Sequence, residues 1–298
     1  MLAGLLCGAA AALPLPARVT FPSLDRDAGG APVTIDALYY RPPQAAAGPV
    51  PLVIAAHGCG GMFSARADRS NQLNERGIAW TEALLADGYA VLWPDSFNPR
   101  GRRTVCTVKR GDPTIAPATR RLDILGALAF AAAQPGIDRT RVALLGWSHG
   151  GSTALASVDG KDARIAEFFA APGAPPPLRA AVAFYPGCGV ALRQGERWLP
   201  SLPLAIHAAE LDDWTPSATC AQLADSARSR GSTMTLTIYP AAHHGFDAPR
   251  GKLTVLKDVT TGSHPDKGVT VGPSPAARAA ADTAVRAFLR DHLQGSSK

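Results

Sequence analysis

Apolar residues along the chain form short continuous runs that alternate with longer segments of helical periodicity. A short run that is apolar at every position is typical of a strand covered on both faces of a sheet. The predicted strands are residues 33–40, 50–56, 90–93, 142–146, 178–185, 202–208 and 234–239. The predicted helices are residues 80–85, 119–133, 221–228 and 275–293.

This alternation predicts an α/β fold in which a mostly parallel central sheet has helices on both faces. Residues 33–40 alternate between apolar and polar positions and are expected as an antiparallel edge strand, whereas residues 234–239 are expected as the last strand. We expect residues 18–298 to form one domain, because the motifs below are spread along the chain and depend on one another. Residues 251–274 look irregular and suit either a lid or a surface excursion.

A Gly-Trp-Ser-His-Gly motif follows the predicted strand 142–146, and a stretch of small, helix-compatible residues follows the motif. This context is typical of a nucleophile elbow, a tight strand-to-helix turn that lifts a serine hydroxyl above the sheet. Glycines flank such a serine because a side chain there would collide with neighbouring backbone. Ser148 is therefore the candidate nucleophile.

A serine hydroxyl needs a base within hydrogen-bond distance, and the base needs a carboxylate that orients it. In this class of fold the chain order is serine, acid and then histidine. His244 follows the last predicted strand and is the preferred base, with His243 as the alternative. Asp212 follows the strand 202–208 and is the preferred acid. Asp213 and Glu210 compete with Asp212, and all three carboxylates also suit a cap for the next helix.

The segment His57-Gly58-Cys59-Gly60-Gly61 follows the strand 50–56 and can turn backbone N–H groups toward the serine. We assign the oxyanion donors to the amides of Cys59 and His149. Trp147, Trp214 and Phe246 adjoin these motifs in sequence and are candidates for an apolar substrate wall, although core packing explains them nearly as well.

The first 17 residues are small and apolar and carry no charge, as in the apolar and cleavage regions of a secretory signal peptide. A positive segment in front of them is missing, so the alternatives are an assigned start that lies too late, a remnant of a signal peptide, or an N-terminal tail. Beyond Cys7, four cysteines remain, which an exported chain could join in two disulfides. The order of the strands favours Cys59–Cys106 and Cys188–Cys220, and no cysteine spacing resembles a zinc site.

The formal net charge of +6 lies in residues 100–121, where seven basic residues face one acidic residue. This segment suits a solvated loop and helix start, or a positive rim that attracts an anionic substrate. Nucleic-acid binding is not expected, because the segment lacks interleaved aromatic residues and a binding motif. No run of about 18 apolar residues predicts a membrane span after the N-terminus.

The motifs together resemble the dienelactone hydrolase family of α/β-hydrolases, over residues 33–298. The resemblance rests on the segments already quoted around Cys59, Ser148, Asp212 and His244, and on Asp95-Ser96-Phe97 with Arg100-Gly101. It implies a triad of Ser148, Asp212 and His244. The namesake enzymes of the family carry cysteine at the elbow, whereas this chain carries serine, which favours ordinary esters over activated lactones.

The sequence therefore predicts a serine hydrolase of carboxylic esters or lactones that acts through an acyl-enzyme and requires no metal or cofactor. The expected partner is a small-molecule ester or lactone. The protein is expected to be exported if the N-terminal segment is a signal peptide, and cytoplasmic otherwise. Alternatives are a peptidase or acyltransferase with the same triad, or a binding module without catalysis.

Overall fold

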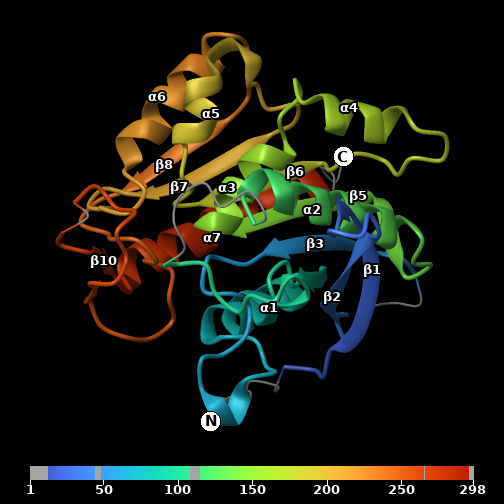
Figure 1. The fold of residues 1–298 in the computed structure, drawn as a ribbon, viewed down its shortest axis with the longest axis horizontal. Helices are drawn as coiled ribbons and strands as arrows, with labels where there is room; N and C mark the ends of the chain where they lie inside the picture. Colours follow the sequence, from blue (N-terminus) through green and yellow to red (C-terminus); the bar gives the residue numbers. More distant parts are fainter. Residues whose placement is uncertain (1–12, 44–47, 108–114, 265, 295–298) are drawn as a thin grey trace, which may run out of the picture.

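The computed structural model describes residues 13–43, 48–107, 115–264 and 266–294. The central sheet has the strand order β1-β2-β4-β3-β5-β6-β7-β8 (Figure 1). Its strands are β1 (Ala17–Arg26), β2 (Pro32–Tyr40), β3 (Val50–Ala56), β4 (Ala90–Pro94), β5 (Ile137–Trp147), β6 (Ala180–Phe184), β7 (Leu204–Ala209) and β8 (Thr235–Tyr239). From β4 to β8 all neighbours pair in parallel, and β2 runs antiparallel to both β1 and β4. The predicted mostly parallel sheet is thus confirmed.

The α-helices of the described residues lie between and after these strands. They are α1 (Glu75–Ala86), α2 (Pro117–Ala132), α3 (His149–Ser157), α4 (Ala163–Ala170), α5 (Gly189–Gln194), α6 (Ser217–Arg228) and α7 (Pro275–Leu293). The described ranges also contain short 3₁₀ helices at Ala67–Arg69, Asn98–Arg100 and Gly195–Arg197.

Helices cover both faces of the sheet, as the continuous apolar strands predict. Alternate residues of β3 divide between two apolar clusters, with Leu52 and Ile54 in one and Val53 in the other. Helices α2, α3 and α6 contribute to the first cluster, and α1 and α7 to the second. Every fourth residue of α7, from Ala277 to Leu293, is buried, which is the period of one helical face. Among the described residues no helix is long and apolar enough to cross a membrane.

Two predictions about the strands are wrong. The segment 33–40 is not at the edge, because β1 pairs with it on its outer side. The pattern of β1 is weak, since only Phe21 and Ser23 of its ten residues are buried. The strand 234–239 is not the last one either: β9 (Thr254–Leu256) and β10 (Val269–Val271) form a separate two-stranded sheet within residues 251–274.

Most of the N-terminal segment that we interpret as a signal peptide, residues 1–12, lies outside the described residues. Within the remainder, Leu13 packs against the second apolar cluster and Ala17 is the first residue of β1.

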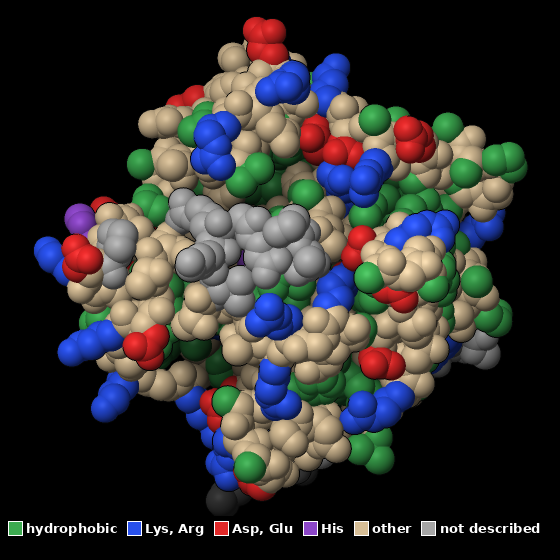
Figure 2. Space-filling view, viewed as in Figure 1, with side chains coloured by type: hydrophobic (Ala, Val, Ile, Leu, Met, Phe, Trp, Pro, Cys, Tyr) green, Lys and Arg blue, Asp and Glu red, His purple; other side chains and the backbone are tan. Residues whose placement is uncertain are grey.

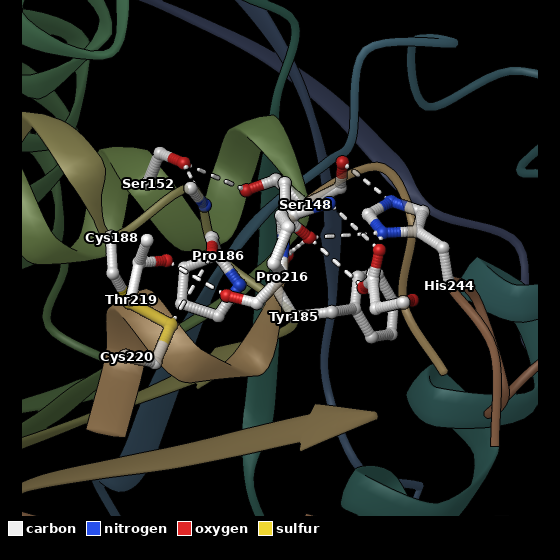
Figure 3. Close-up of a disulfide and its surroundings, with 12 residues drawn as sticks. Ser148, Ser152, Tyr185, Pro186, Cys188, Pro216, Thr219, Cys220 and His244 are labelled. Carbon is white, nitrogen blue, oxygen red and sulfur yellow. Dashed lines mark hydrogen bonds and ion pairs between the residues drawn. A yellow bond between two sulfur atoms is a disulfide. The ribbon is translucent and has the colours of Figure 1, made fainter. Parts of the chain in front are cut away.

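Two disulfides join loops that lie far apart in the chain, and both are the predicted pairs. Cys59 is linked to Cys106 across 47 residues, and Cys188 to Cys220 across 32 residues. The second disulfide ties the loop after β6 to helix α6, and both of its sulfur-bearing residues are fully buried (Figure 3).

Replacing Cys188 and Cys220 together by serine should lower the free energy of unfolding by about 3–4 kcal/mol, the loop-closure value for a crosslink of this span. Urea unfolding of the double variant and of the wild type, each without reductant, measures the difference. A loss below about 1 kcal/mol would contradict a structural role for this disulfide.

Candidate active site

Ser148 stands on a strained turn between β5 and α3. Its backbone angles are φ 53° and ψ −113°, and its N–H donates to the carbonyl oxygen of Phe184. A Cβ atom on Gly146 would lie 2.1 Å from the Gly150 oxygen, and one on Gly150 would lie 1.9 Å from the Ala56 oxygen. Only glycine fits at these two positions, as the elbow motif predicts.

The side chains of His244 and Asp212 form a continuous hydrogen-bonded row with Ser148. The Nε2 atom of His244 lies 2.9 Å from the Oγ atom of Ser148, and its Nδ1 atom lies 2.8 Å from an Asp212 oxygen. His244 comes from the loop after β8 and Asp212 from the loop after β7, so both follow the carboxyl ends of parallel strands. Figure 3 shows the His244 ring facing Ser148.

Asp212 is held by its own loop. One of its carboxylate oxygens accepts from the N–H groups of Trp214 and Thr215, at 2.9 and 2.7 Å. The other oxygen faces His244 and also accepts from the Thr215 hydroxyl at 3.0 Å. That hydroxyl is 2.9 Å from the carbonyl oxygen of Tyr185 as well. Sequence reasoning missed Thr215, although its position three residues after an aspartate is typical of such a loop.

The alternative acid and base residues point elsewhere. Asp213 accepts hydrogen bonds from Thr270, and Glu210 accepts from the N–H of Ala241. His243 has a buried Nδ1 atom without a hydrogen-bond partner among the described residues. The structure therefore brings together Ser148, His244 and Asp212.

The predicted oxyanion residues lie beside Ser148. A Cβ atom on Gly58 would be 3.7 Å from the Ser148 Cβ, so the loop after β3 passes close to the serine. Cys59 is fixed there by its disulfide and by its carbonyl oxygen, which accepts from the N–H of Val105 at 2.8 Å. His149 is the first residue of α3, where a helix leaves N–H groups without intrahelical partners.

The His149 side chain is bound to a buried arginine behind the site. Arg120, which is 1% exposed, donates to the His149 Nδ1 atom at 2.9 Å and lies over the Phe97 ring. Burial, and then the charge of Arg120, lower the pKa of His149 to about 3. Burial also lowers the pKa of Arg120 to about 10. His149 is therefore neutral at physiological pH.

Some arginines of the basic segment are paired inside the protein and are not free to form a positive rim. Arg100 is buried against Asp25 and Asp123, and Arg121 pairs with Asp162. These arginines hold helix α2 and neighbouring loops in place, because buried cations need anionic partners. Arg102 and Arg103 of the same segment are exposed, and Lys109, Arg110 and Asp112 lie outside the described residues, so the positive rim stays a prediction.

A cavity of about 580 Å³ opens at Ser148 and runs along α3. Ser152 and Ala156 line it from successive turns of α3, Asp159 lines it just beyond the end of that helix, and Val190 and Ile115 line it as well. Its lining is mostly apolar. Figure 2 shows hydrophobic side chains gathered in a hollow between the region of α5 and α6 and the region of α2.

Of the three aromatic wall candidates, only Trp214 lines this cavity. Trp147 and Phe246 are buried in the second apolar cluster, where the Trp147 ring stacks between Trp93 and Phe184. The reason is the alternation of side chains along a strand: Trp147 precedes the serine and points to the opposite face of the sheet. These two residues therefore belong to the apolar core and do not line the cavity at Ser148.

Asp247 joins the elements that carry these residues. Its fully buried carboxylate accepts from the indole N–H groups of Trp80 and Trp147, both at 2.9 Å. It also accepts from the Tyr185 hydroxyl at 2.6 Å and from Arg76 Nε at 3.0 Å. Sequence reasoning missed Asp247, although a carboxylate only three residues after the predicted base His244 was a signal of a residue close to the site.

Two other histidines are buried and neutral. Burial, followed by the charge of Arg120, holds the pKa of His57 well below its usual range. Burial lowers the pKa of His207 to about 4, and the His207 Nδ1 atom lies 2.8 Å from the Tyr239 hydroxyl.

The fold and this arrangement of serine, histidine and aspartate define an α/β-hydrolase of the serine-hydrolase type. The sequence pattern of the dienelactone hydrolase family matches residues 35–292, and the chain belongs to that family. The resemblance noted from the motifs is thereby confirmed. No curated protein matches the chain by sequence.

Solved structures with this fold include enzymes of several kinds. A putative dienelactone hydrolase from Klebsiella pneumoniae subsp. pneumoniae MGH 78578 is 18% identical, with a TM-score of 0.60 over 92% of this chain and 98% of that one. A dienelactone hydrolase-like promiscuous phosphotriesterase from metagenomic libraries is 19% identical, with a TM-score of 0.63 over 94% of this chain and 99% of that one. A Mycobacterium tuberculosis puromycin-hydrolyzing peptidase is 15% identical, with a TM-score of 0.62 over 98% of this chain and 42% of that one.

Replacing Asp247 by asparagine should lower the free energy of unfolding by about 3–5 kcal/mol, because it leaves Arg76 without its buried partner and turns an amide N–H group toward other donors. Urea denaturation measures this loss. Asp68→Asn is the matched control, because Asp68 pairs with Arg66 in an exposed ion pair, and this substitution should have little effect on stability. Equal losses in the two variants would contradict the assigned role of Asp247.

The free energy of unfolding should fall as the pH falls below 6.5, the usual pKa of histidine. In that range the histidines of the unfolded chain bind protons, whereas buried histidines such as His207 stay neutral in the folded protein. Each such histidine adds about 1.4 kcal/mol per pH unit to the slope of the free energy of unfolding against pH, down to its pKa in the folded protein. His207→Gln should reduce the slope by that amount between about pH 6 and 4.5 in urea unfolding. The exposed His264 serves as control through His264→Gln, and an unchanged slope in His207→Gln would rule out the buried neutral state.

Proposed function

We propose that this hydrolase cleaves carboxylic esters or lactones through a covalent acyl-enzyme formed on Ser148. The observation that carries the proposal is the distance of 2.9 Å from the Ser148 hydroxyl oxygen to His244 Nε2, together with the bond from His244 Nδ1 to Asp212. This geometry fits a hydroxyl whose proton can be removed as it attacks.

In the proposed reaction, His244 accepts the Ser148 proton while the serine oxygen bonds to the carbonyl carbon. The amides of Cys59 and His149 donate to the oxygen that becomes negative. His244 then gives its proton to the leaving alcohol as the ester bond breaks. Water repeats the two steps on the acyl-enzyme and releases the acid. Asp212 keeps the imidazole in the required tautomer and stabilises its charged form.

The cavity supports an apolar acyl group of considerable length. Ser148 and successive turns of α3 line it as far as Ala156, which corresponds to about 12 Å at the rise of an α-helix. Trp214 provides its aromatic wall beside His244, at a ring-centroid distance of 4.8 Å. We therefore propose esters of medium-chain or aryl acids as the substrate class.

The peptidase and acyltransferase alternatives share the same proposed chemistry. The puromycin-hydrolyzing peptidase with this fold is a longer protein, of which this chain covers 42%. The proposal of an ester substrate rests on the mostly apolar cavity beside Ser148.

Two broader expectations are also proposals. We infer that residues 18–298 form one domain, because β1 pairs with β2 and α7 buries its face on the same sheet. The two disulfides support an oxidising location such as the periplasm or the extracellular space.

Ser148→Ala should abolish labelling by a fluorophosphonate and lower kcat for a p-nitrophenyl ester by roughly 10⁴–10⁶-fold. Intact mass and peptide mapping should locate one adduct on the peptide that contains Ser148 in the wild type. Ser157→Ala is the matched control, because Ser157 lies on the same helix and is not part of the cavity lining. Labelling that persists in Ser148→Ala would refute the assignment, and absent labelling of the folded wild type would favour a binding module.

A further inference from the structure

Asp213 follows the proposed acid directly in sequence but binds another part of the chain. Its carboxylate accepts from the backbone N–H of Thr270, at 2.8 and 3.1 Å, and from the Thr270 hydroxyl at 2.9 Å. Its carbonyl oxygen accepts from the N–H of Ser263 at 2.7 Å. The loop that carries Asp212 is therefore bound to residues 251–274 at two points.

The same segment is bound to the loop that carries His244. The N–H of Gly272 donates to the carbonyl oxygen of His244 at 3.0 Å, and the N–H of Ser274 donates to that of Phe246 at 2.9 Å. In Figure 1 the segment around β10 lies at the end of the sheet toward which β7 and β8 point. Opening it as a lid would break all of these bonds, so the segment is a fixed part of the site.

The anchored segment contributes to the cavity wall. The indole N–H of Trp214 donates to the hydroxyl of Thr261 at 3.1 Å, and both residues line the cavity. Gly262 follows Thr261 and packs so closely against Asp213 that a Cβ atom on Gly262 would lie 2.9 Å from the backbone carbonyl oxygen of Asp213. The position of Trp214 thus depends on contacts on both of its sides, from its own loop and from Thr261.

We propose that Asp213 is a specificity-determining positioning residue, which fixes Trp214 and Thr261 as a rigid cavity wall against the acyl group of the substrate. This inference rests on the ester hydrolysis proposed above. Asp213 does not touch the reacting atoms, because its carboxylate faces Thr270. Its removal should weaken contacts with long acyl chains and leave bond cleavage itself largely intact.

The test compares kcat and KM for p-nitrophenyl acetate and p-nitrophenyl octanoate. In Asp213→Ala the ratio of kcat/KM for octanoate to that for acetate should fall about tenfold, since one lost methylene contact already changes binding about fourfold. The loss should appear mainly as a higher KM for octanoate. Trp214→Phe keeps a ring but loses the bond to Thr261, and it should shift the ratio in the same direction.

Asp213→Asn and Asp258→Ala are the matched controls. Asparagine keeps one oxygen that can accept from the Thr270 N–H, so it should restore most of the wild-type ratio. Asp258 is an exposed carboxylate of the same segment, and its removal should leave the ratio unchanged. Hydrogen exchange of the peptide containing Thr270 should accelerate in Asp213→Ala alone, which verifies the anchor without any substrate.

The outcomes separate this inference from the proposed function. An unchanged ratio in Asp213→Ala overturns the inference, and so does an equal loss of kcat/KM for both esters, which would indicate a general disturbance of the site. The proposed function is judged separately by fluorophosphonate labelling of the wild type. Normal labelling of Asp213→Ala together with a lowered ratio supports both proposals, and a raised ratio overturns the inference.

Discussion

The buried carboxylate of Asp247 is the interaction on which the arrangement around Ser148 depends. It accepts hydrogen bonds from Arg76 and Trp80 of α1, from the last residue of β5 and from the residue after β6. A buried charge is tolerated only when donors surround it, and removing any donor leaves part of that charge unpaired. The loop with His244 is thereby tied to the strand end that carries Ser148, which is what a separation of 2.9 Å between their side chains requires.

Two adjacent carboxylates in the loop after β7, those of Asp212 and Asp213, bind different parts of the chain. Asp212 turns inward to His244, whereas Asp213 turns outward to Thr270. Consecutive residues of a tight turn point in different directions, so neither side chain can replace the other. The helix-capping interpretation of these carboxylates is wrong, because no side chain caps α6 and the N–H groups that Asp212 binds, those of Trp214 and Thr215, precede its N-cap residue Pro216.

Much of the fold could be predicted from the sequence, because buried parallel strands such as β3 are apolar at every position. Strand β1 was missed because most of its residues are exposed and its pattern is weak. Ser148, Asp212 and His244 were recognised through spacing and chain order. The choice between Asp212 and Asp213, the burial of Trp147 and the role of Asp247 depend on side-chain direction, which a single sequence does not contain.

Three of the four disulfide cysteines line the one cavity at Ser148: Cys59 and Cys106 on one side, and Cys188 on the other. The cavity is therefore enclosed by covalent crosslinks as well as by packing. In a chain whose four cysteines are reduced, packing and hydrogen bonds alone would hold these walls together. Discrimination between acyl groups, which depends on the walls, is therefore expected to sharpen when the two disulfides form.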